Sequence, residues 1–416
     1  MISIPKGTKD VLPQDSHKWQ YLEDKVRQTA ALFNLKEIRT PIFEHTELFL
    51  RGIGDTTDVV NKEMYTFIDK GDRSITLKPE GTAAAARSFI ENNLIQYLSP
   101  LKVFYLTPCL RYERPQAGRL RQHHQFGAEF YGDPSAYADA ELISLAFALL
   151  TSVGIKDLKV QINSIGCPIC KLKYDQKLKK YLDAKKDSLC STCLDRFEKN
   201  PLRILDCKTP ACGQVVADAP VILDFVCDDC NSHFELLKHN LTVLNVPFEV
   251  NKWIVRGLDY YTKTVFEFVT TALGAQGTVC GGGRYDNLIQ SLGGKPTPCV
   301  GFGMGLERLL MLMDAFNLPI EPPALDYFII PLSQDCIEFS LALVQAIRSK
   351  NKSADTDFSL KSLKANFKQA EKHNAKNVIV IGDDEVANKE FEIKSQSDGT
   401  LKRVCLQELI DGTVQL

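Results

Sequence analysis

The segment Arg256-Gly-Leu-Asp-Tyr-Tyr261 concentrates side chains that can bind a polar substrate. It places a permanent cation, a carboxylate and two phenols directly before the alternating sequence Val265-Phe-Glu-Phe268. The alternation predicts a strand, so the group would lie at a strand entry. A guanidinium binds carboxylate or phosphate oxygens with fixed geometry, and phenols donate or accept hydrogen bonds. The group suits a substrate with a carboxylate, although a strand-end salt bridge beside two packing aromatics would also explain it.

Two further segments carry polar groups at predicted junctions. In Thr76-Leu-Lys-Pro-Glu80-Gly-Thr82, a strand ends at Pro79 and a helix follows. Glu80 and Thr82 could bind an ammonium group, or they could be a helix cap and its first-turn acid. In Val300-Gly-Phe-Gly-Met-Gly-Leu-Glu-Arg308, a glycine-rich strand leads into a helix, and Gly277–Asp286 is also rich in glycine. Glycines allow a ligand to approach the backbone closely, although many folds use such a junction for packing.

An arginine-rich loop separates two predicted strands, Leu101–Leu106 and Phe126–Tyr131. Arginines at this density suit phosphate groups, whether of a nucleotide or of RNA. Gln125 and Glu129 are four residues apart on the second strand, so both side chains point to the same face of the sheet. The polar residues of the loop are Arg111, Glu113, Arg114, Gln116, Arg119 and Arg121.

The order of predicted elements indicates an α+β catalytic domain on a mostly antiparallel sheet flanked by helices. Residues 1–165 mix strands with helices, including a helix at Trp19–Phe33 and a strand at Leu35–Ile42. Residues 167–245 are richer in cysteine and lysine, and Lys171–Lys186 predicts a charged helix. The earlier pattern then returns. We therefore predict one catalytic domain from residues 1–166 and 246–322, with a helical insertion at 167–245.

A proline-rich linker, Asn317–Ala324, marks the next boundary. Residues 326–416 predict a separate small α/β domain with strands at Tyr327–Ile330 and Val378–Ile381. Within it, lysines recur every three or four residues beside Leu360, Leu363, Phe367 and Ala370, which predicts one basic stripe along a helix. The lysines of this stripe are Lys361, Lys364, Lys368, Lys372 and Lys376.

Composition limits the possible functions. The 416 residues are 44% hydrophobic and 25% charged with a net charge of −2, as in ordinary soluble proteins. Binding of nucleic acid by bulk charge is thereby excluded, and any such binding must use local patches. We find no signal-peptide core and no apolar run of the roughly 20 residues that a membrane helix needs. A cytoplasmic protein without membrane contact is expected.

Thirteen cysteines are many for a cytoplasmic chain, and eight of them lie between Cys167 and Cys230. In a reducing compartment such clustering suggests metal more than disulfides. Cys167-x2-Cys170 and Cys190-x2-Cys193 have the spacing of a four-cysteine zinc site. Cys207, Cys212, Cys227 and Cys230 could form a second set. The alternative is a small helical insertion with buried free thiols.

Together these motifs resemble the histidyl-tRNA synthetase family of class II aminoacyl-tRNA synthetases, over essentially the whole chain. Arg111-Tyr-Glu-Arg resembles the second class II motif and Gly301–Arg308 the third, while Pro41 resembles the proline of the first motif at a dimer interface. Arg256–Tyr261 and Gly282-Gly-Arg-Tyr-Asp286 resemble the two histidine-specific motifs. The resemblance implies a homodimer that joins L-histidine to histidine tRNA, using ATP with Mg2+ and a histidyl-adenylate intermediate.

The resemblance also implies roles for individual residues. Glu129 and Tyr261, beside Tyr260, would hold the imidazole of histidine, while Glu80, Thr82 and Gln125 would hold its ammonium group. Arg256 and Arg111 would be catalytic at the α-phosphate. Arg119 would meet the γ-phosphate, Glu113 the adenine amino group, and Arg308 one face of the base. Gln116 and the lysine stripe are candidates for tRNA contact.

One position departs from the family pattern. His123 stands where phenylalanine usually stacks on adenine, so we expect ATP binding to persist with an altered pH dependence, unless His123 and His124 are loop residues with no direct role. A structural zinc ion in the insertion is compatible with the family but not required by it. The alternative function is a non-catalytic, histidine-binding regulatory paralogue, which typically lacks the anticodon domain.

Overall fold

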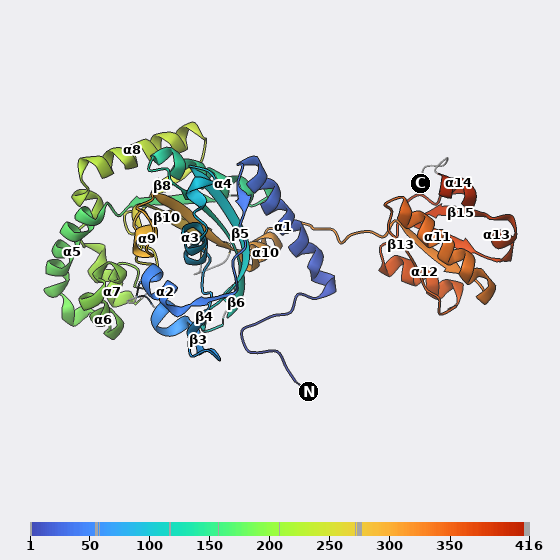
Figure 1. Cartoon of the computed structure of the whole chain (residues 1–416), viewed down its shortest axis with the longest axis horizontal. Helices are drawn as coiled ribbons and strands as arrows, with labels where there is room; N and C mark the ends of the chain where they lie inside the picture. The colour runs from blue at the N-terminus through green and yellow to red at the C-terminus, as the bar shows by residue number, and fades with distance from the viewer. Residues whose placement is uncertain are drawn as a thin grey trace. The chain divides into compact units, whose positions relative to one another are not determined.

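A computed structural model describes residues 2–54, 57, 59–115, 118–156, 158–207, 209–270, 272 and 277–411. The chain forms two compact units, residues 1–319 and residues 320–416 (Figure 1). The insertion lies within the first unit. In the described part of the chain, no helix is both long enough and apolar enough to cross a membrane.

The first unit is built on a sheet that, among the described residues, has eight strands in the order β1-β5-β6-β11-β10-β9-β7-β8. Within these residues, neighbouring strands are antiparallel except at the edges, where β1 with β5 and β7 with β8 are parallel. The predicted mostly antiparallel sheet is therefore confirmed. Its strands are β1 (Lys36–Glu37), β5 (Leu101–Leu110), β6 (Gln122–Tyr131), β7 (Lys159–Ser164), β8 (Phe248–Val250), β9 (Thr262–Val269), β10 (Thr278–Arg284) and β11 (Cys299–Gly305).

The strand predicted at Leu35–Ile42 is much shorter than expected. Only Lys36–Glu37 pair with β5, although the amide of Ile38 still donates to the carbonyl of Phe104 at 2.8 Å. Pro41 lacks an amide hydrogen, and it lies exposed beyond the strand. The chain then enters a small sheet with the order β2-β4-β3, made of β2 (Phe43–His45), β3 (Tyr65–Ile68) and β4 (Ser74–Leu77).

Helices cover both faces of the large sheet. On one face α1, α4 and α10 pack together around buried phenylalanines such as Phe126, Phe130 and Phe302. The other face carries α3 beside α2 and α9 (Figure 1). These helices are α1 (Pro13–Leu32), α2 (Thr46–Ile53), α3 (Thr82–Glu91), α4 (Ala136–Ser152), α9 (Leu288–Ser291) and α10 (Leu306–Ala315).

The inserted residues are helical, as predicted. Tyr174, Leu178 and Leu182 recur on one side of α5 and are fully buried in a core that also includes Val103 and Val265 of the sheet. The insertion is thus packed against the sheet and shares its hydrophobic core. Its helices are α5 (Pro168–Asp183), α6 (Ser191–Lys199), α7 (Pro210–Ala217) and α8 (Asp228–Val243), and α8 packs against α4.

The second unit is a small α/β structure, as predicted. Its sheet has the order β13-β12-β14-β15-β16 in the described residues, with β13, β12 and β14 parallel. The elements are β12 (Tyr327–Pro331), α11 (Ile337–Ser349), β13 (Ala354–Thr356), α12 (Leu363–Lys372), β14 (Asn377–Ile381), α13 (Asp383–Asn388), β15 (Glu390–Ser395), β16 (Leu401–Cys405) and α14 (Leu406–Asp411).

Candidate active site

Glycines of β10 and β11 occupy the centre of one face of the large sheet, which we call the glycine-floored face. Gly301 pairs with Glu129 across β11 and β6, and it pairs with Gly283 across β11 and β10. A Cβ atom at Gly301 would lie 1.6 Å from Oε2 of Glu129, and one at Gly303 would lie 2.0 Å from Nε2 of Gln125. The absent side chains therefore leave room in which polar groups of neighbouring strands lie flat on the sheet.

Glu129 lies at the centre of this face and is fully buried. Its carboxyl group accepts hydrogen bonds from Thr82 Oγ1 at 2.8 Å, from Tyr105 at 2.9 Å and from the hydroxyl of Tyr285. Burial raises the pKa of Glu129 to about 8, although the three hydroxyl donors oppose the shift. A carboxyl group held in this way is a fixed partner for one polar group of a ligand.

The N-terminus of α3 supplies a second polar group. The carboxylate of Glu80 accepts the amides of Thr82 at 2.7 Å and Ala83 at 2.8 Å, so this acid caps the helix, as the simpler interpretation of the sequence held. Gln125 accepts the amide of Gly81 at 2.9 Å. Because Thr82 also reaches Glu129, the structure brings together all four of these predicted histidine-binding residues.

Arg256 lies on the same face, over β10. A Cβ atom at Gly281 would lie 2.2 Å from its Nη2 atom, and its Nη1 atom pairs with Glu267 of β9. Burial opposes the charge, but the Glu267 carboxylate and the Tyr261 hydroxyl together outweigh it and raise the pKa of Arg256. The guanidinium is therefore a permanent cation. Its neighbours Tyr260 and Tyr261 have ring centroids 4.7 Å apart.

The five residues predicted to bind ATP line one cleft of about 170 Å³. Arg111 is anchored by a hydrogen bond of 2.8 Å from Nε to the carbonyl of Pro79, and Arg308 donates to the carbonyl of Thr278. The other residues of the set are Glu113, Arg119 and His123. The Oε1 atom of Glu113 lies 3.8 Å from Nη1 of Arg111, and its Oε2 atom lies 3.7 Å from Nη1 of Arg119. The carboxylate therefore separates two cations that would otherwise repel each other.

His123 and His124 lie on β6, and alternation sends their side chains to opposite faces. His123 shares the face of Gln125 and Glu129, while the Nδ1 atom of His124 lies 2.9 Å from Glu307. Burial, with Arg111 adding to it, lowers the pKa of His123 to about 3. The imidazole is neutral at physiological pH, so the structure argues against the altered pH dependence expected from the sequence.

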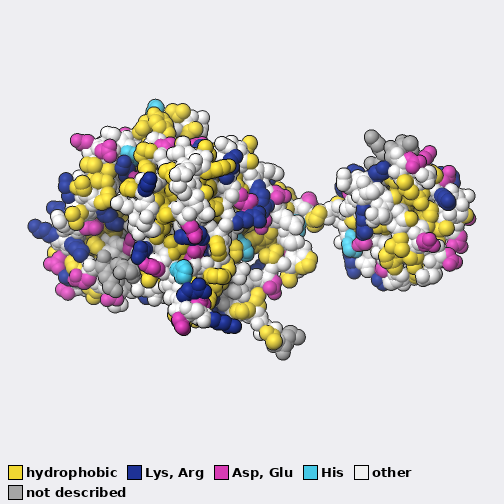
Figure 2. Space-filling model, viewed as in Figure 1, with side chains coloured by type: hydrophobic (Ala, Val, Ile, Leu, Met, Phe, Trp, Pro, Cys, Tyr) yellow, Lys and Arg dark blue, Asp and Glu magenta, His cyan; other side chains and the backbone are white. Residues whose placement is uncertain are grey.

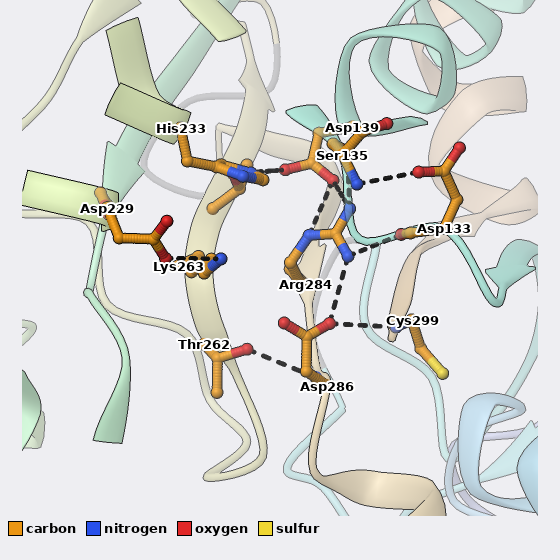
Figure 3. A network of polar contacts seen from close by, with 12 residues as sticks. Asp133, Ser135, Asp139, Asp229, His233, Thr262, Lys263, Arg284, Asp286 and Cys299 are labelled. Atoms are coloured by element: carbon orange, nitrogen blue, oxygen red, sulfur yellow. Dashed lines mark hydrogen bonds and ion pairs between the residues drawn. The ribbon is translucent and has the colours of Figure 1, made fainter. Parts of the chain in front are cut away.

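A buried ion-pair network supports the site from the other side of the sheet (Figure 3). Arg284 is fully buried and donates to Asp139 from Nε at 3.0 Å, and His233 lies 2.7 Å from the same carboxylate. Burial opposes ionisation of Asp139, but Arg284 and His233 outweigh it and lower its pKa. Asp286 accepts from both Arg284 and the amide of Cys299, which links β10 to β11.

Sequence reasoning did not assign roles to Tyr105, Tyr285 or this network. Tyr285 lies within the glycine-rich motif Gly277–Asp286, directly after Arg284, and this position was the sequence signal that could have identified it. Tyr105 pairs with Gly127 across β5 and β6, and a Cβ atom at Gly127 would overlap its ring. The sequence offers no pattern that connects Tyr105 to Glu129 before the register of these strands is known.

The predicted grouping of the cysteines is wrong. Cys167 and Cys170 lie with Cys227 and Cys230, whereas Cys190 and Cys193 lie with Cys207 and Cys212. The reason is α5, whose 16 residues separate the first two cysteine pairs along the chain. A straight helix of that length spans about 24 Å, too far for the two pairs to share an ion.

The lysine stripe is also shorter than predicted. Helix α12 covers Leu363–Lys372, so Lys361 and Lys376 lie outside it and pair with Asp357 and Asp326. Leu360 adopts a positive φ of 46° before the helix and Asn374 a positive φ of 49° after it, so the stripe is shortened at both ends. Three lysines remain on the helix, Lys364, Lys368 and Lys372, and all are exposed. The tRNA candidate Gln116 lies outside the described residues.

Comparison with known proteins shows which protein family this chain belongs to. The family described as Histidyl-tRNA synthetase matches residues 7–185 and 213–309, and the Anticodon binding domain family matches residues 326–416. The chain belongs to the histidyl-tRNA synthetase family. A relative from Clostridium novyi named Histidine--tRNA ligase is 54% identical over 98% of this chain and 97% of its own length. Another with that name, from Clostridioides difficile, is 51% identical over 100% and 99%.

Comparison with solved structures supports membership of the same family. The apo histidyl-tRNA synthetase of S. aureus is similar with a TM-score of 0.84 and 36% identity, covering 99% of both chains. A histidyl-tRNA synthetase from Nostoc is 22% identical with a TM-score of 0.70 and 99% coverage of both chains, which supports the fold alone. The expected resemblance to the histidyl-tRNA synthetase family is confirmed over the whole length of the chain.

Proposed function

We propose that the chain joins L-histidine to histidine tRNA in two steps, with ATP as the energy source and histidyl-adenylate as the intermediate, releasing AMP and pyrophosphate. The observation that carries this proposal is the convergence of two sets of residues on one glycine-floored face. Glu129, Glu80 and Gln125 form one end, the cleft around Arg111 and Arg308 forms the other, and Arg256 lies on the same floor.

The histidine end is built for an amino acid with an imidazole. Glu129 and Tyr261 satisfy the two ring nitrogens, with Tyr260 packed beside Tyr261. The ammonium group binds at Glu80, Thr82 and Gln125, where the capped helix end already gathers carboxylate and amide oxygens. Amino acids without ring nitrogens would leave buried polar groups unpaired, and that cost gives selectivity.

Adenylate formation uses fixed positive charge. The histidine carboxylate attacks the α-phosphorus of ATP, the bond to the bridging oxygen breaks, and pyrophosphate leaves. Arg256 neutralises charge on the carboxylate and the α-phosphate as they approach, and Glu267 holds its guanidinium in place over Gly281. Arg111 meets the same phosphate from the cleft. Positioning and charge neutralisation supply the rate enhancement, with no side-chain nucleophile required.

The remaining cleft residues hold ATP. Arg119 binds the γ-phosphate, Glu113 accepts from the adenine amino group, and Arg308 covers one face of the base. His123 stacks on the base as a neutral ring, which Arg111 and burial together enforce. Mg2+ would be held mainly by the phosphates of ATP and would neutralise part of their charge.

Transfer to tRNA involves both units. A terminal ribose hydroxyl of the tRNA attacks the carbonyl carbon of the adenylate, the bond from that carbon to the phosphate oxygen breaks, and AMP leaves. Gln116 is a candidate for contact with the acceptor end. We assign the catalytic domain to residues 1–166 and 246–322, the inserted module to residues 167–245, and anticodon binding to residues 326–416. Lys364, Lys368 and Lys372 on α12 contact phosphates and carry no base specificity. On the face shown in Figure 2, basic and acidic side chains intermingle over the larger unit, in keeping with recognition by local patches.

The protein is further proposed to act as a cytoplasmic homodimer. Pro41 matches the interface proline of the family, and the strands that follow it expose Phe43, Phe67 and Ile68, whose exposed fractions are 52%, 47% and 63%. Exposed apolar side chains at this density suit an interface. Structural zinc in the inserted module completes the proposed cofactors. Light scattering during gel filtration tests the dimer, and a mass of one chain would contradict it.

The regulatory-paralogue alternative is not favoured. The relatives named Histidine--tRNA ligase align with 98% or more of this chain, including the second unit. The arginines at positions 111, 256 and 308 are also present.

The direct experiment is aminoacylation of histidine tRNA with labelled histidine by the wild type and by Arg256→Ala. We expect charging by the wild type and a loss of about 100- to 1,000-fold in kcat for the variant, the range for removing one group that stabilises transition-state charge. Circular dichroism serves as the control for folding. Near-normal charging by a folded Arg256→Ala protein would refute the role of this residue.

A further inference from the structure

All eight cysteines of the insertion gather in two separate groups of four. The end cluster joins the first helix of the insertion to its last helix, and the middle cluster lies between α6 and α7. In each group the four Sγ atoms lie within 4.8 Å of one another, and each cysteine is a free thiol. The end cluster is Cys167, Cys170, Cys227 and Cys230; the middle cluster is Cys190, Cys193, Cys207 and Cys212.

The sulfur spacing fits a metal ion and does not fit disulfides. Cys167 Sγ lies 3.5 Å from Cys170 Sγ, and Cys190 Sγ lies 3.9 Å from Cys207 Sγ. A disulfide requires about 2.05 Å. Four sulfurs at about 2.3 Å from a tetrahedral zinc ion are about 3.8 Å from one another. A multinuclear iron–sulfur core would push the sulfurs further apart, so the clusters have room for one ion each.

The two clusters share two backbone features, an N-cap cysteine and an amide that donates to a cysteine sulfur, although they are built from different helices. Cys167, Cys190 and Cys227 are the N-cap residues of α5, α6 and α8. The amide of Cys227 donates to Cys170 Sγ at 3.1 Å, and the amide of Cys190 donates to Cys212 Sγ at 3.2 Å. Amide donors and helix N-termini both favour thiolates, the form that binds metal. One repeated geometry at two places argues against chance contact.

Each cluster is connected to the proposed histidine site. The end cluster adjoins the entry to β9, because the amide of Lys263 donates to the carbonyl of Gly166 at 2.8 Å, one residue before Cys167. The middle cluster brings Cys193 and Cys207 together, so the segment between these two residues forms a loop that starts and ends at the cluster. Within that segment, Asn200 donates to Asp259 at 2.7 Å and Arg203 donates to the carbonyl of Arg256 at 3.3 Å.

We propose that the insertion binds two structural zinc ions, one in each cluster, and that the middle ion positions the Arg256–Tyr261 segment through Asn200 and Arg203. The end ion fixes both ends of the insertion against the sheet. All four ligand positions at each ion are filled by thiolates, so neither ion has an open position for catalysis. The positioning role rests on the proposed function, whereas metal binding does not.

Metal content tests the sites without reference to activity. Purified wild type should contain two zinc ions per chain by mass spectrometry of the metal, and cobalt substitution should give the strong visible absorption of tetrahedral thiolate sites. The matched control Cys405→Ser, in the other unit, should keep both ions. Less than one zinc per chain after folding in excess zinc, or iron in place of zinc, would overturn the proposal.

Paired substitutions test the grouping. Cys170→Ser with Cys190→Ser removes one ligand from each cluster and should abolish both ions. Cys170→Ser with Cys230→Ser removes two ligands from the end cluster and should leave one ion. If the clusters instead followed sequence order, the first pair would leave one ion and the second would leave none. Cobalt titration of metal-free wild type, which should saturate at two equivalents, provides a test should a variant fail to fold.

Histidine-dependent ATP–pyrophosphate exchange tests the positioning role. Cys193→Ser with Cys212→Ser should raise the KM for histidine roughly tenfold, the effect of losing one or two hydrogen bonds, and should leave the KM for ATP nearly unchanged. Asn200→Ala should reproduce part of the effect with both zinc ions retained. If the middle cluster lost its zinc and the KM for histidine did not change, the positioning role would be refuted, but the proposal of two zinc sites would stand. Absence of exchange in wild type with two zinc ions would instead refute the proposed function.

Discussion

Glu129→Gln replaces the ionisable carboxyl group at the centre of the glycine-floored face with a neutral amide of the same size. The carboxyl group is fully buried and accepts hydrogen bonds from Thr82, Tyr105 and Tyr285. A glutamine oxygen can still accept two of these bonds, and its amide can donate to the third hydroxyl oxygen. The substitution should therefore preserve the fold while weakening the proposed contact with the histidine imidazole.

The size of the effect follows from the bond that is lost. Above pH 8, where Glu129 is ionised, a hydrogen bond to its charged carboxylate contributes about 1.5–3 kcal/mol, which corresponds to a loss of roughly 10- to 150-fold in histidine affinity in the variant. The proposed ATP site is the cleft around Arg111 and Arg308, so the affinity for ATP should change less than about twofold, since distant sites behave nearly independently. Isothermal titration with histidine, and separately with ATP, measures both values.

Stability provides a second readout with a defined sign. Because the pKa of Glu129 is raised to about 8 from 4.5, the wild type gains stability from the protonated carboxyl group, and that gain is lost as pH rises through about 8. The shift corresponds to on the order of 5 kcal/mol at 1.36 kcal/mol per pKa unit. Glu129→Gln cannot ionise, so its stability relative to wild type should improve between pH 5 and pH 9.

The matched control is Glu141→Gln, which removes a partly exposed carboxylate that pairs with Lys102 on the opposite face of the sheet. Histidine binding by the control should equal that of the wild type. Equal losses of histidine and ATP affinity in Glu129→Gln would place Glu129 outside the histidine site. A pH-independent difference in melting temperature would refute the raised pKa.

Three further predictions concern residues around the site. Gly281→Ala should reduce adenylate formation by about 100-fold or more, because its Cβ would overlap the Arg256 guanidinium, while Gly213→Ala, which faces open space on α7, should not; equal pyrophosphate-exchange rates would contradict this. Asp139→Asn should lower the free energy of unfolding in urea by about 3 kcal/mol at pH 7, since it leaves the fully buried Arg284 with only the partly exposed Asp286 as a charged partner, and the difference should shrink as acid protonates the wild-type carboxylate; a loss under 1 kcal/mol would refute this. The KM for ATP should not vary with the titration of His123 between pH 5.5 and pH 8, because its pKa is about 3, and a His123→Phe variant that removed such a dependence would refute this.

Motif residues were predictable because their chemistry is local. Residues predicted to contact ATP converge on one cleft, since the arginine-rich loop and the glycine-rich strand–helix junction each fix their own geometry. The alternation of β6 was enough to place Gln125 and Glu129 on one face. These features follow from strand period and side-chain type, which the sequence contains.

Features that depend on register or distant packing were not predictable. Tyr105 meets Glu129 only because β5 and β6 pair with Tyr105 opposite Gly127. The cysteine grouping failed because adjacent pairs in the sequence are separated by the length of α5, whereas Cys227 returns to Cys170 through the fold. Lys361 and Lys376 matched the helical period but lie outside α12, because Leu360 before the helix and Asn374 after it both adopt positive φ.

The most direct test of the central claim is amino-acid-dependent ATP–pyrophosphate exchange by the wild type, with histidine compared against the other amino acids. The site described around Glu129, Tyr261 and Arg256 predicts exchange with histidine alone. Histidine binding without exchange, or exchange that is equally fast with an amino acid that lacks ring nitrogens, would contradict it.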